Sequence, residues 1–139
     1  MAARFSDQLL TALRDRMGLR IRVGTTHRFI GIWMVVVEDR LFVRSWSVKR
    51  AGWYRAFVKD PQGFIQVDVR TVPVVAVQTR PKRLRDAVDR AYLQKYATPG
   101  ALKYAKDLGS PKSRATTLEL RPTTSAPSRR VRAPAPASR

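Results

Sequence analysis

The residues with the clearest chemical potential lie between positions 43 and 57, in the stretch VRSWSVKRAGWYRAF. Four of these side chains suit a phosphate, because a guanidinium offers a planar fork, an ammonium offers a point charge and a hydroxyl completes the shell. They are Arg44, Ser45, Lys49 and Arg50. Trp46 lies among them and Trp53 and Tyr54 follow, and the flat rings of all three can stack against a conjugated ring. The stretch therefore predicts a site for a phosphate attached to a flat ring.

A second polar loop and one more aromatic residue extend this candidate site. The sequence TTHR at 25–28 places two hydroxyls, the imidazole of His27 and a guanidinium just before an apolar run that carries Trp33. If the two loops meet at one end of a barrel, they form a single pocket. A structural interpretation stands beside this one, in which Trp53 and Tyr54 anchor a short helix to the core and Trp33 faces the core. In the same interpretation His27 is a solvated side chain and the cations belong to a surface that is basic everywhere.

Other kinds of active site lack the residues they need. The chain has no cysteine and a single histidine, which removes disulfides, thiol nucleophiles and the usual zinc and iron–sulfur sites. The glycines form neither GxGxxG nor GxxxxGK, so the common nucleotide-binding loops are missing. We therefore predict no catalytic side chain and no metal site.

The charge of the chain favours anionic ligands of some kind. The chain carries 28 Lys and Arg against 10 Asp and Glu, a formal net charge of +18. Weak, salt-dependent and sequence-independent nucleic-acid binding is the alternative function, but no basic recognition helix or aromatic RNA-binding signature accompanies the charge. No apolar run has the length of a membrane span or a signal peptide, so we expect a cytoplasmic protein that does not enter a membrane.

The apolar periodicity predicts the elements that must position these residues. A helix begins at Ser6 and ends at Gly18, and a short helix over 52–60 is stopped by Pro61. Strands are expected at 19–23, 30–37, 40–46, 64–70, 72–80 and 116–120, with Glu38-Asp39 as a hairpin turn. The strand 72–80 is the more uniformly apolar and is expected to be central to the core. A helical period follows from Lys82 to about Tyr96, and a shorter helix follows over 101–108. This order predicts a mainly β fold, a barrel of about six antiparallel strands with helices, in a single domain over 1–121. Residues 122–139 are rich in Pro, Ala, Ser and Arg and are expected to be a disordered basic tail.

The same residues resemble a known family. The order RFIGIWMVVVEDRLFVRSWSVKRAGWYRAFVKDPQGFIQV, then RTVPVVAV and AVDRAYLQKY, is similar to a bacterial family catalogued as domain of unknown function 2255. It also resembles the wider FMN- and deazaflavin-binding split-barrel proteins, which include nitroreductase-like enzymes. The resemblance covers roughly residues 19–121.

The resemblance implies a split β-barrel that forms a homodimer and binds FMN or a deazaflavin near the subunit interface, as an oxidoreductase. In this chain the matching positions imply phosphate contacts from Arg44, Ser45, Lys49 and Arg50. Trp33 or Trp53 would contact the ring, and Tyr54 belongs to the same WYR sequence. The chain departs from the pattern just before the strand Trp, because the relatives often have Thr-Pro there and this chain has Ile30-Gly31-Ile32-Trp33.

Overall fold

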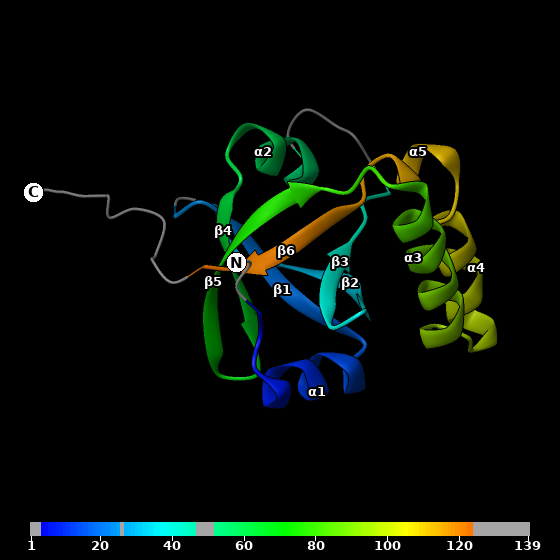
Figure 1. Ribbon diagram of the computed structural model, residues 1–139, viewed down its shortest axis with the longest axis horizontal. Helices are drawn as coiled ribbons and strands as arrows, with labels where there is room; N and C mark the ends of the chain where they lie inside the picture. The colour runs from blue at the N-terminus through cyan, green and yellow to red at the C-terminus, as the bar shows by residue number, and fades with distance from the viewer. Residues whose placement is uncertain (1–3, 26, 47–51, 124–139) are drawn as a thin grey trace, which may run out of the picture.

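The computed structural model describes residues 4–25, 27–46 and 52–123, and this part of the chain forms six strands and five helices (Figure 1). In chain order they are α1 (Asp7–Asp15), β1 (Gly18–Val23), β2 (Ile30–Val37), β3 (Arg40–Val43), α2 (Trp53–Lys59), β4 (Gln62–Val67), β5 (Arg70–Gln78), α3 (Lys82–Lys95), α4 (Pro99–Asp107), α5 (Pro111–Arg114) and β6 (Leu118–Pro122). The strands are all antiparallel and close into a barrel in the order β1-β2-β3-β6-β5-β4. The predicted barrel is confirmed, and β6 ends one residue beyond the predicted domain boundary at 121.

The barrel interior is the main hydrophobic core, and a helix covers each of its ends. Alternate residues of each strand point inward, as the two-residue period of a strand requires. Leu9, Leu10 and Leu13 of α1 pack against this interior at one end, while Phe57 of α2 is buried against it at the other. Figure 1 shows α1 and α2 at opposite ends of the barrel. Trp53 and Tyr54 are half-buried and pack against the same core, so both anchor α2.

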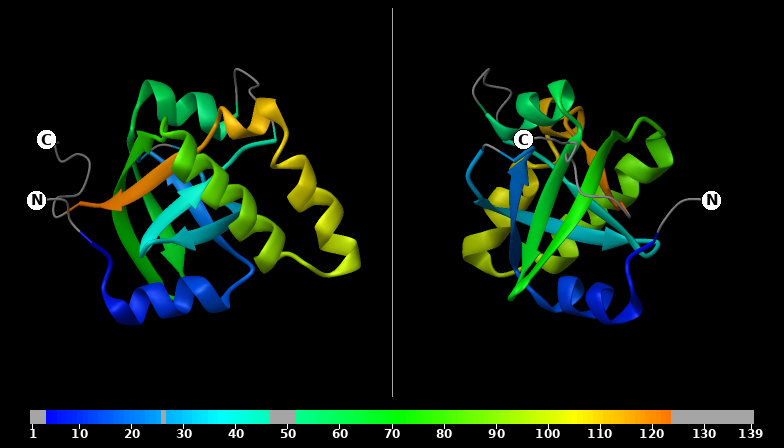
Figure 2. Two further views of the ribbon diagram at one scale, coloured as in Figure 1. Left: turned by 45° about the vertical axis from the view of Figure 1, so that its right-hand side comes forward. Right: turned by 90° about the vertical axis from the view of Figure 1, so that its left-hand side faces the viewer.

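A second core lies outside the barrel, between its wall and two helices. The outward-facing Val35 and Phe42 are buried beneath Val88 and Tyr92 of α3 and its C-cap residue Tyr96, and α4 adds Ala105. This covering explains why the sequence of β2 is apolar on both faces over Trp33–Val37. Figure 2 shows α3 and α4 together on this side of the barrel. The predicted packing role of Tyr92 and Tyr96 is confirmed, since both are 0% exposed.

The turn between β4 and β5 lies elsewhere than predicted. The expected strands 64–70 and 72–80 place the break at Thr71, whereas Asp68 and Val69 form the turn and Val67 pairs with Arg70. Asp68 has a φ of 56°, the left-handed conformation that a tight hairpin needs. Val69 is 97% exposed at the tip, so an apolar side chain that suggests a strand stands in a turn. β5 contributes less to the core than its apolar sequence predicts, because Val74 is its one fully buried residue. The Glu38-Asp39 turn is confirmed, with φ values of 55° and 60°.

Several other boundaries also differ from prediction. β3 ends at Val43 rather than at 46, β6 begins at Leu118 rather than at 116, and the short α5 was not expected. α4 begins at Pro99, because Thr98 caps the helix and proline suits its first turn. Gly18 does not end α1 but begins β1, where a Cβ would lie 2.5 Å from the carbonyl oxygen of Ile32. The glycine is needed there for the close approach of the two strands.

The side chain of Tyr96 joins α3 to the backbone of β2. The pairing of β2 with β1 ends where Trp33 faces Gly18, and Met34 is the next residue. The backbone N–H of Met34 donates to the Tyr96 hydroxyl at 3.1 Å, and the carbonyl oxygen of Met34 lies 2.8 Å from that hydroxyl. Burial raises the pKa of Tyr96 above its usual range, so the hydroxyl stays protonated and can donate. The phenol thus supplies hydrogen-bond partners for the backbone groups of Met34, at the point where β2 extends beyond its pairing with β1.

Replacing Tyr96 with Phe is expected to lower the free energy of unfolding by about 1–3 kcal/mol, because the Met34 backbone groups lose a buried partner. Chemical denaturation of the purified variant measures this. Tyr104→Phe is the matched control, since Tyr104 is 47% exposed and should change stability by less than about 0.5 kcal/mol. Equal effects of the two substitutions would contradict the role given to the Tyr96 hydroxyl.

Candidate functional site

A cavity of about 400 Å³ lies outside the barrel, where the first half of β2 meets the end of β3 and the start of α2. We call it the aromatic cavity, because three tryptophans line it. Its lining residues are Ile30, Gly31, Ile32, Trp33, Arg44, Ser45, Trp46, Gly52, Trp53 and Leu108. Four of the residues predicted from the sequence, Trp33, Arg44, Ser45 and Trp53, are therefore brought together around one space.

The rings around the aromatic cavity are held in fixed positions by their neighbours. Trp33 stacks on Tyr96 with ring centroids 4.0 Å apart and planes 2° apart, so one face of its indole is used within the protein. Trp46 lies 5.9 Å from Trp33 at a tilt of 60° and is 44% exposed. Trp53 meets the ring of Phe57 edge to face. The wall of the cavity is thus apolar and rigid, a surface suited to a flat ring.

Arg44 is buried, and its guanidinium is used within the fold. It donates from Nε to the Thr117 hydroxyl at 2.9 Å and from its terminal nitrogens to the carbonyl oxygens of Leu108 and Arg85, each at 2.9 Å. It also forms an ion pair with Asp89. Burial lowers the pKa of Arg44 below its usual value, and the hydrogen bond that Arg44 donates to Asp89 opposes this shift. The side chain therefore fixes the end of β3 against α3, α4 and β6 rather than reaching into open space.

Asp89 links Arg44 to a second arginine. Its other carboxylate oxygen pairs with Arg114 of α5, and Arg114 also bonds Asp86 at 3.0 Å. The pair of Asp86 with Lys82 extends the network along α3. These ion pairs tie α5 to α3 and so hold the segment that leads into β6.

Ser45 is held by the same segment. Its backbone N–H donates to the Thr116 hydroxyl at 2.8 Å, and that hydroxyl donates to the carbonyl oxygen of Ser113 at 2.6 Å. Ser45 is buried, at 6% exposure, and lines the aromatic cavity. Its position at the strand end agrees with the prediction from the sequence.

The remaining predicted residues fall into two groups. His27 is exposed in the loop between β1 and β2, and Tyr54 packs on the barrel core, and neither belongs to the lining of the aromatic cavity. Lys49 and Arg50 lie outside the described residues. Trp46 and Gly52, which border the segment 47–51 in the sequence, both line the cavity.

A second cavity, of about 560 Å³, continues from the aromatic cavity over the outer face of β1 and β4. We call it the arginine cavity. The two share Gly31, Ile32, Trp33 and Trp46, and the arginine cavity adds Arg16, Gly18, Leu19, Arg20, Gln66, Val67 and Asp68. Gly31 lies on the boundary, and a Cβ at this position would meet no atom within 4 Å. Sequence reasoning missed the arginine cavity and the open space at Gly31, although a lone glycine inside a strand was a usable signal.

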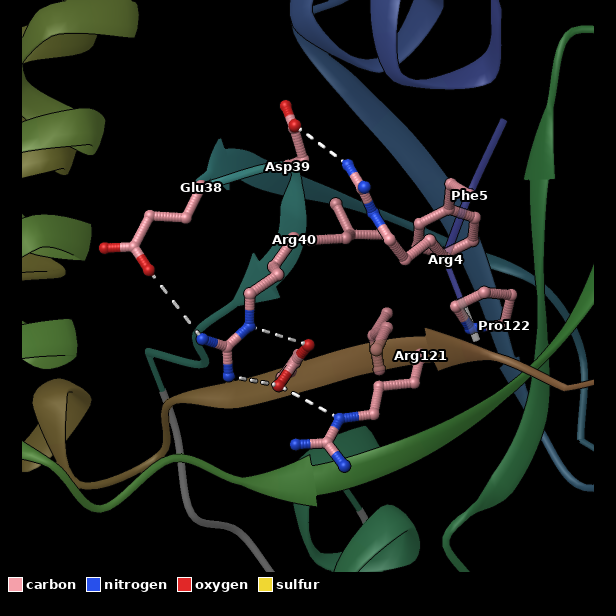
Figure 3. A pocket seen from close by; sticks show the side chains of 10 residues that line it. Arg4, Phe5, Glu38, Asp39, Arg40, Arg121 and Pro122 are labelled. Atoms are coloured by element: carbon pink, nitrogen blue, oxygen red, sulfur yellow. Dashed lines mark hydrogen bonds and ion pairs between the residues drawn. The ribbon is translucent and has the colours of Figure 1, made fainter. Parts of the chain in front are cut away.

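A third cavity, of about 310 Å³, lies at the β2–β3 turn and is rich in charge. Figure 3 shows Arg40 reaching toward Glu38 and Arg4 toward Asp39. Arg40 also pairs with Glu119 at 2.8 Å. Burial alone would raise the pKa of Glu119, but bonds from Arg40 and Arg121 lower it below its usual range. Each carboxylate here has a cationic partner, so the cluster secures the hairpin to β6.

Among residues 4–25, 27–46 and 52–123, no group of three His, Asp or Glu side chains is placed to hold a metal ion. In the same ranges no helix is long and apolar enough to cross a membrane.

Comparison with protein families identifies the chain. The family described as "Uncharacterized protein conserved in bacteria (DUF2255)" matches residues 12–120, so the chain belongs to this family, as the sequence predicted. Curated proteins give no sequence match.

Three solved structures share the fold at low sequence identity. The conserved hypothetical protein Rv2991 from Mycobacterium tuberculosis has a TM-score of 0.57 and 9% identity, over 86% of this chain and 80% of that one. The heme storage protein HutZ from Vibrio cholerae has a TM-score of 0.58 and 13% identity, over 86% and 89%. An F420-H2 dependent reductase (FDR-A) has a TM-score of 0.56 and 13% identity, over 76% and 94%. At these identities the likeness concerns the fold alone.

Replacing Asp89 with Asn is expected to lower the free energy of unfolding by about 1–3 kcal/mol, because the buried Arg44 loses its only charged partner among the described residues. Denaturant titration measures the change. Asp107→Asn serves as the control, because Asp107 is exposed near the end of α4 and should have an effect below about 0.5 kcal/mol. An Asp89→Asn protein as stable as the parent would show that the network does not hold this end of the barrel.

Proposed function

We propose that this protein binds a flavin-type cofactor, FMN or a deazaflavin, with its flat ring in the aromatic cavity, and that it acts as an oxidoreductase. The observation that carries the proposal is the convergence of Trp33, Trp46 and Trp53 on one space whose rim includes Ser45. A volume of about 400 Å³ is within the range of small-molecule sites. The shared fold of a reductase that depends on F420-H2 supports the same class of cofactor.

The ring would lie against the indoles, and the apolar wall would keep water from it. Trp46 is the side chain that gains most from such contact, because 44% of it is exposed. Stacking of this kind contributes about 0.5–1.5 kcal/mol per aromatic pair beyond the burial of area. Trp33 is already fixed by Tyr96, so its position costs little further ordering on binding.

The phosphate-binding role predicted for Lys49 and Arg50 remains part of the proposal. The segment that carries them begins and ends, in sequence, at residues that line the cavity. Ser45 would add a hydroxyl at the rim. Arg44 has a different role in this proposal, since its donors are engaged with Thr117, Leu108 and Arg85 and it acts by holding the rim in place.

The cofactor, when bound, would supply the hydride chemistry, which suits a chain without an evident catalytic side chain. The protein's own residues would orient the ring and shield it.

A homodimer is a further expectation from the family resemblance, and light scattering on the purified protein tests it.

Heme and nucleic acid are less well supported ligands. The chain has one histidine to offer as a heme ligand, and that residue, His27, is exposed outside the lining of the aromatic cavity. Nucleic-acid binding stays a prediction from the net charge. Many of the cations in the described ranges are paired with carboxylates, which reduces the charge free to meet a polyanion: Arg4, Arg14, Arg16, Arg40, Arg44, Lys82, Arg83, Arg114 and Arg121.

We expect FMN or oxidised or reduced deazaflavin to raise the melting temperature of the full chain. A ligand at about 100 times its dissociation constant stabilises the folded state by about 2.7 kcal/mol, a shift on the order of 10 °C for a domain of this size. Differential scanning fluorimetry measures this, and heme and a DNA duplex are tested in parallel. A chain whose melting temperature responds to none of the flavins, or only to heme, would refute the proposal.

The substitution Gly31→Val tests whether the cofactor binds in the aromatic cavity. The new side chain projects into the boundary of the two cavities and is expected to abolish the shift caused by the cofactor. Stability of the free protein should not fall, since a Cβ at Gly31 meets no atom and valine favours a strand. Gly100→Ala in α4 is the control at another glycine with open space around it, and it should leave cofactor binding unchanged.

A further inference from the structure

We propose that the arginine cavity binds the carboxylate end of a small molecule whose apolar body lies against Trp33 and Trp46, with Arg20 as the residue that holds the carboxylate. This is a second ligand site, next to the one proposed for the cofactor. Calling its ligand the substrate rests on the proposed function, but the binding itself does not.

The floor of the arginine cavity is the outer face of three neighbouring strands. Arg20 of β1 stands opposite Gln66 of β4 on one side and opposite Gly31 of β2 on the other. Because the residue at 31 has no side chain, the space above β2 beside Arg20 is open. Among the described elements, α3 and α4 cover the later part of β2 and leave this part of the sheet face uncovered (Figure 2).

The charges in the cavity favour one small anion. Arg16 is paired with Asp68, so these two charges balance. Within residues 4–25, 27–46 and 52–123, no carboxylate is paired with Arg20, which is exposed. One unbalanced guanidinium fits one singly charged carboxylate, which it can bind through two parallel hydrogen bonds. A dianionic phosphate would leave an excess negative charge beside Asp68. The amide of Gln66 adds a neutral donor on the β4 side.

The apolar part of the cavity lies a short distance from Arg20. Trp33 pairs with Gly18, two residues along β1 from Arg20, so the Cα atoms of Arg20 and Trp33 are separated by about 8 Å from the spacing of strands and residues. Trp33 and Trp46 form the wall that the two cavities share. A ligand that spans this distance has its carboxylate directly on, or a few bonds from, an aromatic or aliphatic body. Aryl carboxylates and short arylalkanoates are the chemical class that fits.

The test compares two ring compounds of equal shape, the anion 2-naphthoate and the neutral 2-naphthamide, binding to the full-length chain. Titration calorimetry gives the affinities, and NMR shifts of the indole N–H groups of Trp33 and Trp46 locate the binding. We expect 2-naphthoate to bind about tenfold more tightly than the amide, because only the anion gains a charge-assisted bond. Equal affinities, or no binding of 2-naphthoate at millimolar concentration, would overturn the proposal.

Two arginine variants separate a specific contact from general attraction to a basic protein. Arg20→Gln is expected to remove the preference for the anion and to leave the binding of the amide unchanged. Arg90→Gln removes the same charge from an exposed position on α3 and is expected to keep the full preference. If both variants lose the preference for the anion equally, the attraction is long-range and Arg20 does not hold the carboxylate.

The outcome is independent of the cofactor test. A chain that is stabilised by FMN or deazaflavin but does not discriminate 2-naphthoate from 2-naphthamide contradicts the carboxylate site alone. A chain that discriminates them through Arg20, and whose melting temperature no flavin changes, contradicts the proposed function alone.

Discussion

The architecture depends on how the unpaired edge of β2 is satisfied. β2 continues past the point where β1 begins, and Met34 is the first residue left without that neighbour. The backbone N–H of Met34 donates to the Tyr96 hydroxyl. The Lys95 ammonium donates to the carbonyl oxygen of Met34 at 3.1 Å. The same ammonium donates to the carbonyl oxygen of Leu13 in α1 at 3.0 Å. Two adjacent side chains at the end of α3 thereby hold α1, β2 and α3 together, and the ring of Tyr96 positions Trp33 for the aromatic cavity.

The helices divide the barrel wall into two surfaces with different uses. Where α3 and α4 pack, the outward residues of β2 and β3 are apolar and buried, and the surface serves stability. Over β1 and β4 the outward residues include Arg20, Arg22, Phe64 and Gln66. The guanidinium of Arg22 lies 4.8 Å from the ring centroids of both Phe29 and Phe64. Trp33 stands at the border of the two surfaces. A site at such a border can combine a rigid wall with open access, and this is the reason that both proposed ligands are assigned to it.

The sequence predicts the elements well because each depends on local periodicity. The apolar stripe of α3 and the two-residue period of β1 are readable without any partner. The role of Arg44 is not, since its partners Asp89 and Thr117 are 45 and 73 residues away in the chain and only the closed barrel brings them near. Residue type alone therefore indicates a phosphate ligand where the structure has a buried ion network. Trp33 and Trp53 both line the aromatic cavity, and the cofactor contact predicted for them stays a prediction. The turn at Asp68-Val69 was missed because its second residue is apolar.

Gly31 sets the width of both cavities without taking part in the packing of the barrel. A Cβ at this position would enter the space of the two cavities and meet no protein atom within 4 Å. Most positions that shape a pocket also support the core, so a change that alters ligand size there also reduces stability. At Gly31 the shape of the cavities and the stability of the core do not depend on the same side chain. Selectivity for ligands of different size can therefore evolve, or be engineered, by single substitutions at position 31 without a compensating change elsewhere in the fold.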